Sequence, residues 1–171
     1  MISIQQVTLE SLNQMNKVTF TETVGWVFEH SPWVAEQAWI KRPFSSLVEL
    51  HQDMMTVVEE SSIGAKIDLL RKHPDLAASV KMANASIKEQ AEIGLNRLSQ
   101  EEYEVFLALN RTYTLKFGFP FIIAVRGHSK DSIRNAMVER VRYPYNQELE
   151  EALRQVYKIA LFRLSDLIRN A

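Results

Sequence analysis

The spacing of apolar residues is the feature that most restricts the fold of this chain. In its long segments apolar residues recur every three to four positions, which is the repeat of one face of an α-helix. Only five glycines and five prolines interrupt the 171 residues, and each proline lies at a segment boundary. With helices of about 10–14 residues, the pattern predicts an all-α bundle of roughly eight helices. We find no linker or internal repeat, so we expect a single domain over residues 1–171.

Several helix ends can be located from local motifs. Ser46 with Glu49, and Ser99 with Glu102, have the spacing of a capping box at a helix start. Gly118 follows a long helical run, and it predicts a left-handed residue that ends that helix.

One segment departs from the helical pattern. Residues Phe117–Gly127, with the sequence "FGFPFIIAVRG", combine glycine and proline with a compact apolar run. We expect a buried irregular stretch, whose main-chain N–H and C=O groups need partners other than a helix. A polar ligand is one possible partner. The alternative, equally open, is a loop that fills the core with three phenylalanine side chains.

Composition and charge exclude several classes of function. The formal net charge of -1 gives no basic surface for nucleic acid or for membranes. The absence of cysteine excludes disulfides, thiolate zinc sites and a cysteine nucleophile. No apolar run approaches the ~20 residues of a membrane span. The ends of the chain show neither a secretory signal nor a peroxisomal Ser-Lys-Leu type signal, so we expect a cytoplasmic protein.

Arg163 lies on the apolar face of the last predicted helix. On a helical wheel that face contains Leu149, Leu153, Val156, Ala160, Leu164 and Leu167. A buried guanidinium keeps its proton and therefore needs an acceptor or an anion. The partner could be an internal carboxylate, or Arg163 could bind an anionic ligand. The wheel alone leaves both interpretations open.

The segment "SIKEQ", Ser86–Gln90, also has two interpretations. Ser86 and Glu89 fit a capping box, in which Glu89 has only a structural role. Alternatively, Glu89 and Gln90 lie at a helix start whose dipole favours a charged carboxylate, which could orient a histidine or bind substrate.

His73 precedes Pro74, and proline disfavours the helical conformation in the residue before it. We therefore expect the imidazole at a helix end. It could be a cap, a core residue or a general acid/base, since histidine titrates near neutral pH. The spacing of its neighbours does not match a metal site. Of the four histidines, we rank His73 first for chemistry.

Five motifs occur together in one order, and together they carry a family resemblance. They are "GWVFEHSPWVAE", "HPDLA", "SIKEQAEIGLNRL", "LNRTYTLKFGFPFIIAVRG" and "IALFRLSDL". From about Val7 to Ile168 the chain resembles the 2-oxo-4-hydroxy-4-carboxy-5-ureidoimidazoline (OHCU) decarboxylases of purine catabolism. The resemblance implies conversion of OHCU to (S)-allantoin, the last step from urate, with no metal and no organic cofactor.

The same resemblance implies roles for individual residues. His73 is similar to the catalytic histidine of the family, and Glu89 to its acidic partner. The implied substrate-binding residues are Pro74, Ser86, Gln90, Phe119, Phe121, Ile122, Ile123, Ala124 and Arg163. Within this set, the segment 119–124 is expected to bind the ureido and ring amides through its backbone, and Pro74 to shape the pocket.

The family resemblance further implies a homodimer whose only other partner is the small-molecule substrate. Trp26, Trp33 and Trp39 could be core residues or interface anchors. Two other functions stay open at this point. One is a non-catalytic helical binding domain of the same fold, and the other is a different cofactor-free lyase or hydrolase that acts on a cyclic ureide.

Overall fold

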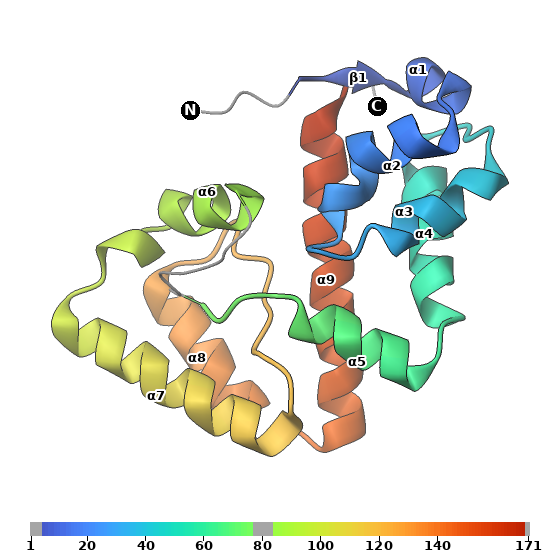
Figure 1. Ribbon diagram of the computed structural model, residues 1–171. Coiled ribbons are helices and arrows are strands. Elements are labelled where there is room, and N and C mark those ends of the chain that lie inside the picture. Colours follow the sequence, from blue (N-terminus) through green and yellow to red (C-terminus); the bar gives the residue numbers. More distant parts are fainter. Residues whose placement is uncertain (1–4, 77–83, 170–171) are drawn as a thin grey trace. The chain divides into compact units, whose positions relative to one another are not determined.

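The computed structural model describes residues 5–76 and 84–169, with the backbone alone for residues 84–87. Nine α-helices lie within these described residues (Figure 1). They are α1 (Leu9–Gln14), α2 (Lys17–Val24), α3 (Trp33–Ala38), α4 (Leu47–Glu59), α5 (Ile63–Arg71), α6 (Asn84–Glu92), α7 (Gln100–Phe117), α8 (Lys130–Arg140) and α9 (Tyr145–Leu167). Three short 3-10 helices accompany them: η1 (Gly25–Val27), η2 (Trp39–Lys41) and η3 (Leu95–Arg97). The prediction of a mostly helical fold is confirmed.

A small sheet was not predicted from the sequence. Strand β1 (Val7–Thr8) pairs in parallel with strand β2 (Ile168–Arg169). Each strand is two residues long, which is too short to produce the alternating pattern that identifies a strand in a sequence.

The chain divides into two compact units. The first contains the residues up to Leu69 together with those from Tyr157 onward, and the second is Leu70–Val156. In the first unit the core is formed by apolar side chains of α1 to α4 and of the end of α9. Its members with 1% exposure or less include Leu12, Phe20, Val24, Val34, Ala38, Leu50, Met54, Val58, Ala160 and Leu164. The single domain expected from the sequence stays a prediction.

The predicted helix ends are confirmed in most details. Ser99 accepts a hydrogen bond from the Glu102 N–H, and the Glu102 carboxylate accepts one from the Ser99 N–H, so this capping box is complete. Gly118 has a φ of 80° and ends α7. At α4 the prediction was half right. Ser46 accepts from the Glu49 N–H as expected, whereas the Glu49 carboxylate accepts from the Ser45 N–H.

The apolar face predicted for the last helix is buried. Its six residues are Leu149, Leu153, Val156, Ala160, Leu164 and Leu167, and none is more than 8% exposed. The three tryptophans Trp26, Trp33 and Trp39 are half-buried, which fits neither a fully buried core position nor a fully exposed one. Among the helices of the described residues, none is long and apolar enough to cross a membrane.

Candidate active site

The predicted irregular segment is present between helices α7 and α8. Residues 119–125 form neither helix nor strand, and Figure 1 draws this connection between α7 and α8 as a plain tube. Phe119 and the residues from Phe121 to Val125 are only 1–8% exposed. The prediction of a buried irregular stretch is confirmed for these residues, whereas Phe117 is the last residue of α7 and Arg126 and Gly127 form an exposed turn.

The aromatic side chains of this segment belong to the core. Phe119 stacks on Phe117, with ring centroids 6.0 Å apart, and Phe121 meets Tyr113 edge to face at 5.3 Å. These contacts support the interpretation in which the phenylalanines fill the core. Substrate binding by the backbone of Phe119 and Phe121 stays a prediction.

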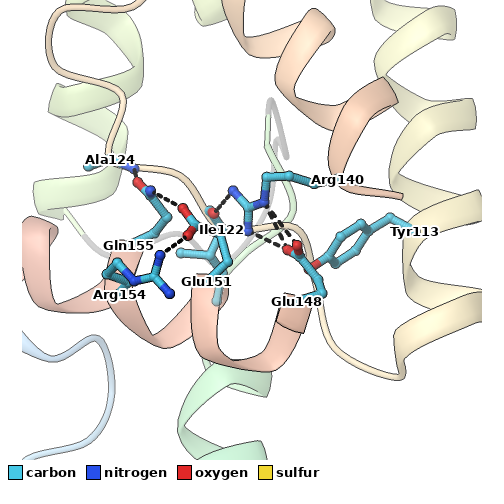
Figure 2. A network of polar contacts seen from close by, with 8 residues as sticks. All are labelled: Tyr113, Ile122, Ala124, Arg140, Glu148, Glu151, Arg154 and Gln155. Carbon is cyan, nitrogen blue, oxygen red and sulfur yellow. Dashed lines mark hydrogen bonds and ion pairs between the residues drawn. The ribbon is translucent and has the colours of Figure 1, made fainter. Parts of the chain in front are cut away.

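Two backbone groups of the segment are bound by side chains from two helices. Arg140, the last residue of α8, donates from Nη1 to the Ile122 carbonyl oxygen at 2.8 Å. The Ala124 N–H donates to Oε1 of Gln155, on α9, at 3.0 Å. Figure 2 shows both side chains reaching the segment. The expectation that buried backbone groups need partners is thus met for these two groups by the protein itself.

A buried ion pair fixes the position of Arg140. Its Nε donates to Glu148 Oε1 at 2.9 Å and its Nη2 to the same oxygen at 2.5 Å. The Tyr113 hydroxyl donates to Glu148 as well, at 2.5 Å. Burial, together with this hydrogen bond, raises the pKa of Tyr113, so the phenol stays protonated and remains a donor. The guanidinium also lies over the Phe121 ring, 4.3 Å from its centroid.

The amide of Gln155 is fixed by a second set of contacts. Its Nε2 donates to Glu151 Oε1 at 2.8 Å, and Arg154 binds the other carboxylate oxygen of Glu151 at 2.7 Å. A carboxylate can only accept, so the amide must direct its nitrogen to Glu151 and its oxygen to Ala124.

His73 lies where the sequence predicts it, in the bend after helix α5. Its N–H donates to the Leu70 carbonyl at 3.2 Å, and the residue is 7% exposed. Two hydrogen bonds position this bend. Arg71 Nε donates to the Gly118 carbonyl at 2.9 Å, and Asn110 Nδ2 donates to the Leu76 carbonyl at 3.1 Å. The first of them brings the chain before His73 next to the start of the irregular segment.

Helix α6 includes Ser86, Glu89 and Gln90. Because the helix already begins at Asn84, Ser86 is not its N-cap, and the capping-box interpretation of Ser86 with Glu89 is wrong. Their spacing of three and four residues puts the three positions on one face of α6. Gln90 is 7% exposed and Glu89 is partly buried.

Arg163 is 4% exposed and has an internal partner. Its Nη2 lies 3.3 Å from Oε2 of Glu29, whose side chain is fully buried, and its Nη1 donates to the Trp26 carbonyl at 3.3 Å. Of the two partners that the sequence allowed for Arg163, an internal carboxylate or an anionic ligand, the internal carboxylate is present. Arg163 belongs to the first unit, while His73, Glu89 and the segment 119–124 belong to the second. Their convergence on one cleft stays a prediction.

His51 is a second buried histidine, in the middle of helix α4. Its Nε2 bonds to the Tyr157 carbonyl at 2.8 Å, and since a carbonyl only accepts, this nitrogen carries a proton. Burial lowers the pKa of His51 below its ordinary 6.5, and the bond to Tyr157 opposes this effect. His51 has the environment of a structural histidine.

Sequence reasoning missed four residues of this region: Tyr113, Arg140, Glu148 and Gln155. One signal was available, because Glu148 and Gln155 are seven residues apart and so share a helix face. Among the described residues, no group of three or more histidine, aspartate or glutamate side chains could hold a metal ion.

Comparison with known proteins identifies the family of this chain. The family model of OHCU decarboxylase matches residues 13–165. The chain belongs to the OHCU decarboxylase family. An OHCU decarboxylase of Halalkalicoccus jeotgali is 44% identical over 162 residues, which are 95% of this chain and 92% of that protein. The uric acid degradation bifunctional protein PucL of Bacillus subtilis is 45% identical over 161 residues.

This member of the OHCU decarboxylase family matches one relative over nearly its full length and the other over only part of it. The match covers 94% of this chain but only 33% of the bifunctional protein. A solved structure of an (S)-allantoin synthase superposes with a TM-score of 0.79 at 32% identity. That match covers 95% of this chain and 54% of the other. The family fold therefore extends over nearly all of this chain.

Proposed function

We propose that this chain is a carboxy-lyase that converts OHCU to (S)-allantoin in urate degradation without a cofactor. The observation that carries the proposal is the family match over residues 13–165. The relative from Halalkalicoccus jeotgali, which bears the same activity in its name, is matched over 92% of its length. The name of the superposed (S)-allantoin synthase agrees with the proposed product.

The substrate itself explains why no cofactor is required. Its carboxylate is on a carbon next to a C=N bond. When the C–C bond to the carboxylate breaks, CO2 leaves and the electron pair forms a C=C bond to the neighbouring carbon, while the π pair of the C=N bond moves to its nitrogen, which takes up a proton. The hydroxyl on the same carbon then becomes a carbonyl as its proton leaves, and the former imine carbon gains a proton. The enzyme has to bind the ring, leave the carboxylate weakly stabilised, and protonate one face.

His73 and Glu89 are the proposed acid/base pair. His73 would take the hydroxyl proton and direct proton delivery to one face of the planar intermediate, which accounts for a single enantiomer. Glu89 would orient the imidazole and keep it basic. The burial of His73 in a bend fixed on both sides supports the proposal, because a general acid/base must be held within hydrogen-bond reach of the reacting atoms.

Arg163 is proposed to bind the ring or the ureido group and not the departing carboxylate. Its positive charge is balanced by the buried carboxylate of Glu29. An arginine that is already paired offers N–H donors without a net charge, so it suits a neutral carbonyl oxygen. A strong cation next to the carboxylate would stabilise the ground state and slow the loss of CO2. Ser86, Gln90, Pro74 and the backbone of residues 119–124 complete the proposed substrate site.

The test is a coupled assay, since the substrate is unstable. Urate is converted in the cuvette by uricase and the hydrolase that follows it, and circular dichroism records optically active allantoin. The protein should raise the rate of its appearance well above the slow background, which gives a racemate. If the folded protein produces no acceleration, the proposal fails and the non-catalytic binding domain becomes the better interpretation.

Three further expectations stay proposals. The family resemblance supports a homodimer, which light scattering coupled to size-exclusion chromatography will test. The location in the cytoplasm that we expect from the sequence is tested by cell fractionation. A single domain over the chain predicts one cooperative transition in urea. Two resolved transitions would show that the two units fold separately.

A further inference from the structure

The side chains of Arg140 and Gln155 bind one backbone carbonyl and one backbone N–H of the irregular segment, the two kinds of group that a neighbouring strand would bind. The groups that they bind are the Ile122 carbonyl and the Ala124 N–H, which are two residues apart. In an extended chain, such groups point to the same edge and would pair with one neighbour in a sheet. In the same geometry, the groups of the intervening residue, Ile123, point to the opposite edge.

Both side chains are held in one orientation by contacts of their own. Arg140 is fixed by Glu148, whose side chain is fully buried, and Gln155 is fixed by Glu151 (Figure 2). Neither side chain can rotate without breaking these bonds. Backbone groups that bind a ligand need such supporting contacts, because these contacts hold the groups in the geometry that binding requires.

We propose that Arg140 and Gln155 are positioning residues, which fix one edge of the segment 119–124 so that the opposite edge binds the ureide. On that edge the main-chain groups of Phe121 and Ile123 would meet the ureido and ring amides. The inference rests on the proposed function. It assigns no chemical step to Arg140 or Gln155, and it predicts that they act on affinity more than on turnover.

The first test is Gln155→Met, which keeps the length of the side chain and removes the acceptor for the Ala124 N–H. The variant should raise KM for the substrate and Kd for (S)-allantoin in parallel by about tenfold, with kcat changed much less. Arg140→Lys should act in the same direction, because a lysine cannot bind Glu148 and Ile122 with the same fork. The Kd is measured by calorimetry with (S)-allantoin.

Two controls separate positioning from general damage. Arg134→Met removes an exposed arginine of α8, which pairs with Asp131, and it should leave KM and Kd unchanged. The double variant Glu151→Gln with Gln155→Glu exchanges donor and acceptor and restores an acceptor for Ala124. It should recover most of the affinity that Gln155→Met loses. A merely structural role would lower the amount of folded enzyme and would leave the KM of the folded fraction unchanged.

The possible results distinguish this inference from the proposed function. If the wild-type protein is active and Gln155→Met and Arg140→Lys, both folded, keep its KM and Kd, the positioning inference is overturned. If either variant fails to fold, the other variant and the double variant decide in the same way. If the wild-type protein neither forms nor binds (S)-allantoin, it is the proposed function that fails.

Discussion

Arg140 and Glu148 form an ion pair that is almost completely removed from solvent. The side chains are 6% and 0% exposed, and the shortest contact, from Nη2 to Oε1, is 2.5 Å. The pair joins the end of α8 to the first turn of α9 and also holds the Ile122 carbonyl. If one partner is removed, the other charge stays buried without a counter-charge, and the folded state is strongly destabilised.

The first prediction concerns this pair. Arg140→Met should lower the free energy of unfolding by about 3–5 kcal/mol, because Glu148 is then left buried and charged. The double variant Arg140→Met with Glu148→Met should recover part of that loss. Urea denaturation measures both. A double variant less stable than Arg140→Met would contradict the assignment of the cost to the unpaired carboxylate.

The second prediction concerns His73. His73→Asn should reduce kcat by about 10²–10⁴-fold, the usual contribution of a general acid/base, while the fold is retained. His30→Asn is the matched control, since His30 has a φ of 51° that asparagine tolerates. The control should be as active as the wild-type protein in the coupled assay. Turnover by His73→Asn at the wild-type rate would remove His73 from the mechanism.

The third prediction tests the donors of Arg163. Arg163→Lys keeps a cation for Glu29 but loses the planar fork of N–H groups. A hydrogen bond from a charged donor contributes about 1.5–3 kcal/mol, so the loss of such a bond to the substrate should lower kcat/KM by about 10- to 100-fold. Arg154→Lys, on the exposed side of the same helix, should change kcat/KM little. Equal effects of the two substitutions would argue against substrate contact by Arg163.

The fourth prediction is a pH dependence of stability that arises from His51. Its pKa in the folded protein is lowered by burial, so between that value and 6.5 the unfolded chain binds more protons than the folded one. Stability therefore falls as the pH drops below 6.5 toward the folded pKa. His51→Gln retains an N–H donor for the Tyr157 carbonyl and should flatten this dependence. Urea unfolding from pH 5 to 7.5 compares it with the wild-type protein, and an equal slope in the two proteins would contradict the prediction.

Local features of the fold could be predicted from the sequence. The capping box of Ser99, the end of α7 at Gly118 and the buried face of α9 all depend on residues within a few turns of one another. The irregular segment was recognisable because glycine, proline and a short apolar run exclude a helix there. Patterns of this kind are physical preferences of the local chain.

Pairs between distant residues could not be predicted in the same way. Glu29 is 134 residues from Arg163, and no spacing rule links them. The wheel showed that Arg163 needs an acceptor, but it could not say which carboxylate supplies one. The partners of the irregular segment depend likewise on how α8 and α9 pack. The capping-box interpretation of Ser86, one of the two that the sequence left open, is wrong for a related reason, because the same motif also occurs inside helices.

The ion pair of Arg140 and Glu148 also restricts the connection between the two helices that carry it. The turn from Val141 to Pro144 is held at both ends by that pair, and Lys116 binds the Val141 and Tyr143 carbonyls within it. Surface turns usually accept inserted residues at small cost. This one should not, since lengthening it would separate the two charges, and epitope tags or fluorescent labels are better placed elsewhere in the chain.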